Sequence, residues 1–265
     1  MQKTKLKYNL VIVGLQPWST ALGSNCIDMA KVFSQTCRVL YVNRASDRKT
    51  ELSKWFGNSD SNSNLHRKNE HYTLTPVSQN LWVLDPGVIL ESINLFSGKP
   101  FKYLLRKNNK KFANRINKAI SELHFKDFIL FNDNDFFQGQ FLNEELSPRL
   151  FIYYLRDFLI NQPYFKRNGK NMEIDILQKA DLVITNSRYL KKYAELYNPE
   201  SYDIGQGCTV SIPVSSGEHI VPIELQNIKV PVIGYVGNLV TMRLDLHLLE
   251  EMALVRKDLC WVFVG

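Results

Sequence analysis

Short apolar runs alternate with helical patterns along the first part of the chain. The run Tyr8 to Gly14 (YNLVIVG) ends in glycine and is typical of a parallel strand buried on both faces. Ser24 is placed to cap a helix that extends to Ser34, and a second apolar run, Arg38 to Asn43, follows as the next strand. A strand, a glycine-bearing loop, a helix and a strand in this order predict the opening of a doubly wound, Rossmann-like parallel sheet.

The same alternation continues to residue 205. Strands are predicted at 127–132, 149–155, 181–185 and 202–204, and helices at 100–123, 137–146, 171–179 and 187–197. Ser187 is the expected N-cap of the last of these helices. The segment 44–70, in contrast, is polar and predicts a long surface loop, which is either a lid or binding element or a plain insertion.

The pattern of the N-terminus begins again near the end of the chain. A turn-rich segment predicts a linker over 206–230. The elements expected after it are a strand at 232–236, a helix at 244–256 and a strand at 260–264. One such unit is too small to build a sheet covered on both faces. The sequence therefore predicts a Rossmann-like domain over 1–205 and, over 231–265, the start of a second one in a longer natural protein.

Composition places the chain among ordinary globular proteins. Its 265 residues carry 33 Lys and Arg against 26 Asp and Glu, a net charge of +7, and 45% of them are hydrophobic. No run approaches the roughly 18 apolar residues of a membrane-spanning helix, and the N-terminus lacks a signal-peptide pattern, so a cytoplasmic location is expected. The four cysteines and five histidines lack metal-ligand spacing, which predicts reduced cysteines and no bound zinc.

Much of the positive charge is concentrated on the predicted helix 100–123. The cations of this segment are Lys99, Lys102, Arg106, Lys107, Lys110, Lys111, Arg115 and Lys118. No acidic residue occurs from Ser92 to Ser121, so the segment is either a solvated outer helix face or a surface, at 99–118, that contacts an anionic membrane at its inner face. Nucleic acid is not expected as a partner, because the aromatic residues of this helix are predicted to lie on its buried stripe.

Four segments resemble one family of enzymes. They are YYLRDFLINQPYFKRNGKNME at 153–173, KADLVITNSRYL at 179–190, IGQGCTV at 204–210 and PVIGYVGNLVTMRLDLHLLEEMA at 231–253. In this order they resemble GT-B glycosyltransferases, particularly bacterial sugar-nucleotide transferases of the capsule, exopolysaccharide and teichuronic acid type. The resemblance covers 153–265 well and 8–43 loosely.

The resemblance implies an acceptor-binding N-terminal domain and a second domain that binds a nucleotide-sugar donor. The expected reaction is transfer of the sugar to a cell-surface glycan or a lipid-linked acceptor. Two departures stand out: Tyr154 and Phe158 occupy positions of the family's paired acids, which leaves only Asp157, and the family's donor-contacting E-x7-E carboxylates have no counterpart before Gly265. The chain alone is therefore expected to be inactive.

The residues expected to bind acceptor follow predicted strands, where open α/β sheets bind ligands. Asp157, beside Arg156, is expected to orient an acceptor hydroxyl, although a helix cap or a simple partner for Arg156 also explains it. Gly14 and Trp18 are expected to line the acceptor pocket or the donor-sugar pocket, and Trp18 either stacks on a sugar ring or belongs to the core. Glu173 matches a family carboxylate and is either a substrate-binding group or an exposed helix residue.

The donor is expected to meet the loop after the first strand of the second unit. Gly237 and Asn238 would let backbone amides approach the nucleotide sugar, and Arg243 could hold its phosphate with bidentate geometry. The alternative for Arg243 is an ordinary surface pair with Asp245.

No cofactor is expected, and a metal is not strictly required. The loop after the first predicted strand lacks G-x-G-x-x-G spacing and a P-loop lysine, which argues against dinucleotide and P-loop nucleotide binding. The Asp133-x-Asp135 spacing would suit a divalent cation on a diphosphate, but a polar turn with an aspartate cap is favoured. Two other functions remain open: a nucleotide-sugar epimerase of the same fold, and a non-catalytic α/β protein that binds a glycan or an acidic partner.

Overall fold

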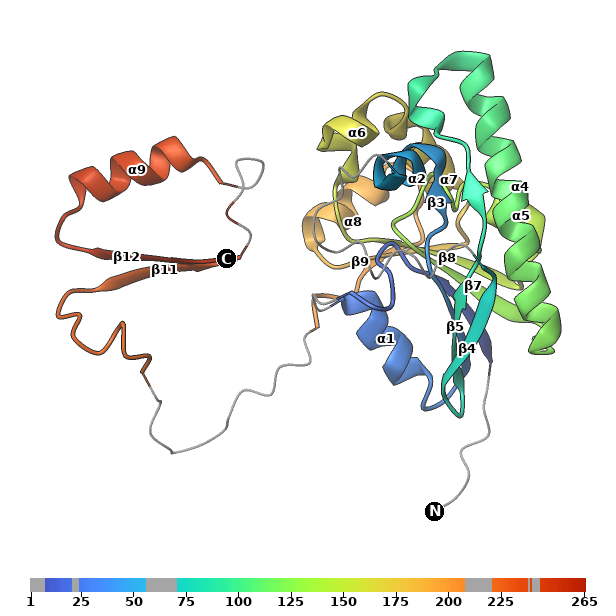
Figure 1. The fold of residues 1–265 in the computed structure, drawn as a ribbon, viewed down its shortest axis with the longest axis horizontal. Coiled ribbons are helices and arrows are strands. Elements are labelled where there is room, and N and C mark those ends of the chain that lie inside the picture. Colours follow the sequence, from blue (N-terminus) through green and yellow to red (C-terminus); the bar gives the residue numbers. More distant parts are fainter. Residues whose placement is uncertain (1–7, 21–23, 56–70, 208–220, 238, 240–243) are drawn as a thin grey trace. The chain divides into compact units, whose positions relative to one another are not determined.

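The computed structural model describes residues 8–20, 24–55, 71–207, 221–237, 239 and 244–265. The chain divides into two compact units, Met1–Val210 and Ser211–Gly265 (Figure 1).

An eight-stranded sheet forms the centre of the first unit, in the order β10-β9-β8-β7-β1-β2-β5-β4. Its strands are β1 (Asn9–Val13), β2 (Arg38–Val42), β4 (Thr73–Ser78), β5 (Leu81–Asp85), β7 (Phe128–Asp133), β8 (Leu150–Leu155), β9 (Leu182–Thr185) and β10 (Ser201–Asp203). All neighbours are parallel except β4, which pairs antiparallel with β5 at one edge. The chain leaves β1 on the β2 side and later returns to build β7 on its other side, so the direction of winding switches between β1 and β7.

The helices of the first unit are α1 (Asn25–Phe33), α2 (Arg48–Trp55), α4 (Gly98–Glu122), α5 (Leu142–Leu146), α6 (Pro163–Lys166), α7 (Gly169–Lys179) and α8 (Arg188–Ala194). Short 3-10 turns lie at Ile93–Leu95 and Leu159–Asn161, and β3 (Ser46–Asp47) pairs with β6 (Ile89–Leu90) outside the main sheet.

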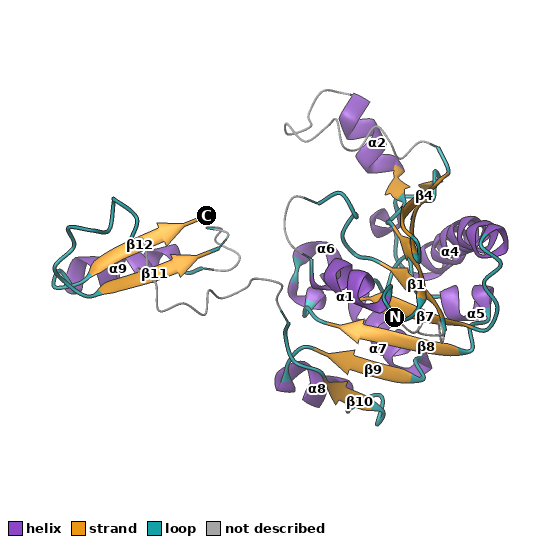
Figure 2. Cartoon of the chain, turned by 90° about the horizontal axis from the view of Figure 1, so that it is seen from below, coloured by secondary structure: helices purple, strands orange, loops and turns teal. Residues whose placement is uncertain are grey.

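Helices cover both faces of the sheet (Figure 2). Side chains alternate along a strand, so Val11 and Val13 of β1 join the core on one face while Leu10 and Ile12 join the core on the other. Residues of α4, α5, α7 and α8 complete the first core, and α1 completes the second. The predicted fold class, a doubly wound parallel α/β sheet followed by a second β-α-β unit, is confirmed.

The second unit pairs β11 (Val232–Val236) in parallel with β12 (Cys260–Val264), connected through α9 (Leu246–Val255). The N-cap of α9 is Asp245, whose carboxylate accepts a hydrogen bond of 3.0 Å from the amide of Leu248. Across the described part of both units, no helix combines the length and the hydropathy needed to span a bilayer.

Several local predictions were wrong. The helix expected over 137–146 is only α5, because the side chain of Asp135 binds the amides of Phe137 and Gln138 and holds them in a turn. The segment 44–70 was expected to be a loop, but its described part contains β3 and α2. Ser24 occupies the N-cap of α1 without a side-chain hydrogen bond, whereas Ser187 caps α8 as predicted, accepting from the amide of Leu190.

The cysteines were expected to be reduced core residues. Cys26, Cys37 and Cys260 are free, but only Cys26 of these three is fully buried, and Cys37 and Cys260 are half-buried. The middle of the predicted linker and Cys208 lie outside the described residues.

Candidate active site

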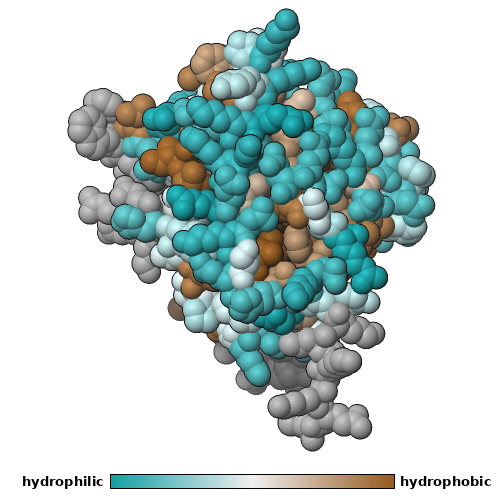
Figure 3. Space-filling model, turned by 90° about the vertical axis from the view of Figure 1, so that its right-hand side faces the viewer, coloured by the Kyte–Doolittle hydropathy of each residue, from teal (hydrophilic) through white to brown (hydrophobic). Residues whose placement is uncertain are grey.

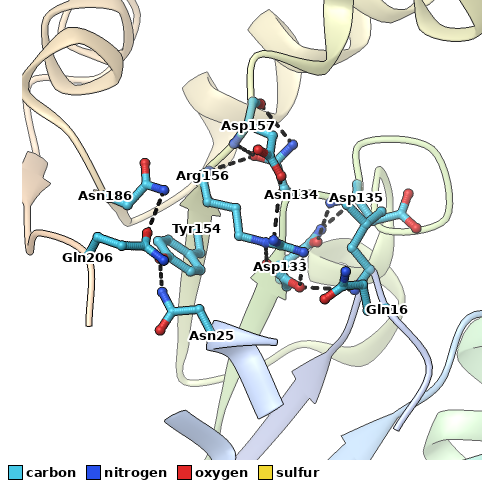
Figure 4. Close-up of polar contacts among 12 residues, drawn as sticks. Gln16, Asn25, Asp133, Asn134, Asp135, Tyr154, Arg156, Asp157, Asn186 and Gln206 are labelled. Atoms are coloured by element: carbon cyan, nitrogen blue, oxygen red, sulfur yellow. Dashed lines mark hydrogen bonds and ion pairs between the residues drawn. The ribbon is translucent and has the colours of Figure 1, made fainter. Parts of the chain in front are cut away.

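Polar side chains gather at the carboxyl ends of the strands, around the switch between β1 and β7 (Figure 4). They are Gln16 after β1, Arg44 after β2, Asp133, Asn134 and Asp135 at the end of β7, Arg156 and Asp157 after β8, Asn186 after β9 and Gln206 after β10. In an open α/β sheet this edge is where ligands bind.

A buried ion pair connects β7 to the loop after β8. The guanidinium of Arg156 donates from Nε to Oδ1 of Asp133 at 2.6 Å and from Nη2 to Oδ2 at 3.3 Å. Oδ2 also accepts from the amide of Leu15 at 3.1 Å, which ties the loop after β1 to the same carboxylate. The Asp133 side chain is fully buried and that of Arg156 is 13% exposed. Burial raises the pKa of Asp133, while the charge of Arg156 and the two sets of hydrogen bonds oppose that rise.

Asn134 fixes the backbone of Asp157, in the loop after β8. Its φ of 56° places it in the left-handed region, which asparagine tolerates better than most residues. Its Oδ1 accepts from the amides of Arg156 at 2.8 Å and Asp157 at 3.3 Å, and its Nδ2 donates to the carbonyl of Asp157 at 3.2 Å. The position of Asp157 is therefore set by β7 as well as by its own strand.

Asp157 is the carboxylate of this group that reaches solvent. Its side chain is 47% exposed, and its Oδ2 lies 3.5 Å from Nη1 of Arg156. The structure thus supports the interpretation of Asp157 as a partner of Arg156, and the described contacts include no helix cap made by its side chain. A catalytic role for it stays a prediction.

Asp135 and Arg44 form a second, separate pair. Oδ2 of Asp135, whose side chain is 2% exposed, lies 2.9 Å from Nε of Arg44, while its Oδ1 accepts from two backbone amides. Asp133 and Asp135 consequently point to different arginines, and the favoured polar-turn interpretation of this segment fits the contacts. Within the described residues, no group of three or more His, Cys, Asp and Glu side chains is arranged to hold a metal ion.

The loop after β1 is held by packing. A Cβ at Gly14 would lie 2.0 Å from the hydroxyl of Tyr41, so the close approach of this tyrosine requires glycine. Tyr41 donates to the carbonyl of Gln16 at 2.7 Å, and the amide of Trp18 donates to Oδ1 of Asn43 at 2.8 Å. Trp18 is half-buried and meets the edge of Tyr41, with ring centroids 5.1 Å apart. These contacts explain Gly14 and Trp18 as part of the fold, and their binding roles stay predictions.

Glu173 lies inside the molecule, so the prediction that it could be an exposed helix residue was wrong. It is fully buried in α7, and its Oε2 accepts a hydrogen bond of 2.9 Å from the hydroxyl of Tyr193. Burial raises its pKa to about 7. The adjacent Tyr153 in β8 is fully buried too, and its pKa is raised by burial and then by the charge of Glu173. Within the described contacts, Glu173 touches none of the side chains at the switch point.

Of the residues expected to bind the donor, Gly237 is described. It follows β11 with a φ of 153°, and a Cβ there would lie 2.8 Å from the hydroxyl of Tyr235. Asn238 and Arg243 lie outside the described residues, so the predicted phosphate contact and the alternative pair with Asp245 both stay predictions.

Two further hydrogen-bonded pairs at this edge were not predicted from the sequence. Nδ2 of Asn25 donates to the hydroxyl of Tyr154 at 2.6 Å, and Nδ2 of Asn186 donates to Oε1 of Gln206 at 2.9 Å. Asn186 and Gln206 each follow a predicted strand closely, and that position was the signal that could have identified them.

No protein-family model matches the sequence, and the curated proteins contain no match. Solved structures with a similar chain path include sucrose-phosphate synthase from Thermosynechococcus elongatus (12% identity, TM-score 0.43, 76% of this chain and 90% of that chain). Arabidopsis thaliana UGT89C1 complexed with UDP-L-rhamnose is similar over 98% of this chain and 69% of its own (9% identity, TM-score 0.46). A Listeria monocytogenes structure assigned as UDP-N-acetylglucosamine 2-epimerase is similar over 98% and 62% (12% identity, TM-score 0.45). The fold assignment itself rests on the strand order of this chain.

Proposed function

We propose that this chain belongs to a GT-B glycosyltransferase, in which the first unit binds the acceptor and the second contributes to binding a nucleotide-sugar donor. The observation that carries the proposal is Asp157: an accessible carboxylate at the switch point, next to Arg156 and fixed through its backbone by Asn134. The resemblance of residues 153–265 to capsule, exopolysaccharide and teichuronic acid enzymes supports the same proposal and suggests a cell-surface glycan or lipid-linked acceptor.

The reaction needs a positioned hydroxyl. The acceptor oxygen forms a bond to the anomeric carbon of the donor sugar while the bond from that carbon to the diphosphate breaks, and the hydroxyl proton passes to the carboxylate of Asp157. Asp157 is placed to accept a hydrogen bond from that hydroxyl and so to orient it. Nη1 of Arg156 lies 3.5 Å from Oδ2 of Asp157 and helps to hold that carboxylate in place. The leaving diphosphate would be neutralised at the second unit, by the loop that contains Gly237, Asn238 and Arg243.

The rest of the edge suits a hydroxyl-rich ligand. Gln16, Asn25, Asn186 and Gln206 carry amide side chains, each of which can donate and accept hydrogen bonds as sugar hydroxyls do. Neutral amides also fit a polar, uncharged acceptor better than a row of charges would.

The experiment supplies the chain with its natural continuation, if it has one, combines it with a panel of nucleotide sugars and candidate glycan acceptors, and compares wild type with Asp157→Asn. We expect the variant to bind donor as wild type does but to transfer sugar about 10²- to 10⁴-fold more slowly, as loss of a positioned acid–base group typically does. Asp127→Asn is the matched control, because Asp127 is exposed just before β7, at the opposite end of that strand, and its φ of 48° suits asparagine.

Equal rates for wild type and Asp157→Asn would remove Asp157 from the mechanism. If wild type converts a nucleotide sugar to a free product without any acceptor, an epimerase replaces the proposal. Glycan binding without transfer by the wild-type protein, supplied with its natural continuation if it has one, indicates a non-catalytic binding protein.

A further inference from the structure

One face of α4 presents positive charge that the described part of the molecule leaves largely unpaired. The buried side of this helix, with Phe101, Leu105 and Phe112, is anchored in the core. On the opposite side Lys102, Lys107 and Lys110 are exposed, and no ion pair to a described residue involves any of the three.

The carboxylates that border this face are already engaged. Glu91 pairs with Arg48 and lies 3.8 Å from Lys111, while Glu144 pairs with both Arg106 and Lys179. No acidic residue occurs between Ser92 and Ser121, so the part of α4 that carries these lysines has no counter-charge within it; Glu122, at the end of the helix, lies 3.8 Å from Lys118. Figure 3, which views the molecule from the side of α4, shows hydrophilic side chains over most of this face, interrupted by separate hydrophobic patches.

Hydrophobic side chains project beside these lysines. Leu95 is 65% exposed, Phe96 is 42% exposed and Tyr103 is 69% exposed. The expectation that the aromatic residues of this helix lie on its buried stripe was therefore wrong for Tyr103, because its position two residues after Phe101 turns it about 200° away from the core. Lys99, Tyr103, Lys107 and Lys110 recur at helical spacing, so they share one exposed face.

We propose that this surface docks on an anionic membrane. We call it the α4 docking face, and it comprises Leu95, Phe96, Lys99, Lys102, Tyr103, Lys107 and Lys110. Cations on one exposed helix face attract the negative headgroups of a bilayer, and exposed aliphatic and aromatic side chains next to them enter the boundary between headgroups and acyl chains. This combination holds a protein on the cytoplasmic surface of a membrane without spanning it. The proposal does not depend on sugar transfer.

Single-stranded nucleic acid is the competing partner for a basic surface. It is bound by a positively charged groove along which aromatic side chains provide successive stacking platforms. The α4 docking face lies on one convex helix instead, and two of its three hydrophobic residues, Leu95 and Phe96, precede the helix at one end. Leu95 and Phe96 thus lie at one end of the row of lysines and Tyr103 lies within it, which fits insertion into a bilayer better than stacking along a strand.

The test measures co-sedimentation of the full chain with vesicles of phosphatidylcholine mixed with phosphatidylglycerol, against vesicles of phosphatidylcholine alone, at low and high salt. Wild type should bind the anionic vesicles and lose that binding as salt screens the charges. Lys102→Gln, Lys107→Gln and Lys110→Gln together should lower partitioning about 100-fold, because each basic residue near an anionic membrane contributes about fivefold. Leu95→Ser with Phe96→Ser should lower partitioning while leaving its salt dependence unchanged.

The matched control removes three exposed cations elsewhere in the first unit, through Arg149→Gln, Arg188→Gln and Lys192→Gln. It changes the net charge equally and should retain most of the binding. Thermal melts of each variant exclude loss of folding as the cause. Absence of wild-type binding to anionic vesicles, or equal losses for the control and the α4 variant, would overturn the proposal. So would tighter binding of single-stranded DNA than of vesicles, if the same three lysine substitutions abolish it.

Discussion

Two fully buried carboxyl groups, Asp133 in β7 and Glu173 in α7, face very different surroundings. Asp133 accepts two hydrogen bonds from Arg156 and one from the amide of Leu15, whereas the described hydrogen bonds of Glu173 are limited to one, from the hydroxyl of Tyr193. Burial raises the pKa of both groups, but only Asp133 has a cation beside it to oppose that rise. Burial alone therefore does not decide what a buried acid does, because a cation next to it stabilises its charged form.

This difference gives the two acids different tasks. Asp133 joins the loops after β1 and β8 at the switch point and can do so only while it is paired. Glu173 lies between α7 and α8 and is neutral over much of the acidic pH range. Asp133 is an ionic link beneath the candidate active site, and Glu173 couples the packing of two helices to pH.

Breaking the ion pair should have the largest effect. Asp133→Leu leaves Arg156 mostly buried without its counter-charge, and we expect the free energy of unfolding to fall by about 3–5 kcal/mol. Combining it with Arg156→Met should regain more than half of that loss, because a hydrophobic pair of similar volume replaces two desolvated charges. Urea unfolding measures both variants. A loss below about 1 kcal/mol for the single variant, or no recovery in the double variant, would contradict the role of this pair.

The second test follows stability with pH. The pKa of Glu173 is about 7 in the folded chain and its ordinary value is 4.5, so the folded state holds a proton that the unfolded state has released between these values. The stability that this proton contributes is complete below pH 4.5 and is lost as pH rises through 7, a decrease of about 3 kcal/mol. Urea unfolding gives the free energy of unfolding of wild type and of Glu173→Gln across this pH range. The value for wild type minus that for Glu173→Gln should fall by this amount as pH rises.

The control for this experiment is Glu195→Gln. Glu195 is the C-cap of α8, and its side chain is 42% exposed and pairs with Lys191. The value for wild type minus that for Glu195→Gln should change little with pH. If the stabilities of wild type and Glu173→Gln change equally with pH, then Glu173 is ionised in the folded chain over this range and burial does not raise its pKa.

The fold was largely predictable because its central strands are continuous apolar runs. β1, β2, β8 and β9 coincide with such runs, and the restart after the linker marks β11 and β12. The antiparallel β4–β5 edge was not predicted from the sequence, and the shortness of α5 depends on one side chain, that of Asp135, which satisfies backbone amides outside any helix.

The site was predictable only in part, since position after a strand identifies a residue but not its partner. Arg156 and Asp157 follow from that rule, yet the pairing of Arg156 with Asp133 joins residues 23 apart and appears only when β7 and β8 lie side by side. Gly14 was expected to approach a ligand, and the structure shows that it makes room for Tyr41. The burial of Glu173 was not predicted either, because the sequence of α7 alone does not show which neighbouring helix will cover its side chain.

The smallest effect should come from the single hydrogen bond that Glu173 receives. Tyr193→Phe removes the hydroxyl that lies 2.9 Å from Oε2 and that lowers the pKa of Glu173. We expect a loss of about 1 kcal/mol of stability at pH 5, and a further rise of the Glu173 pKa, so that the decrease in stability extends above pH 7. Tyr189→Phe, on an exposed side chain of the same helix, is the control. If Tyr193→Phe instead moves the decrease to lower pH, the hydroxyl of Tyr193 does not stabilise the ionised form of Glu173, and the neutral acid must be held by another contact.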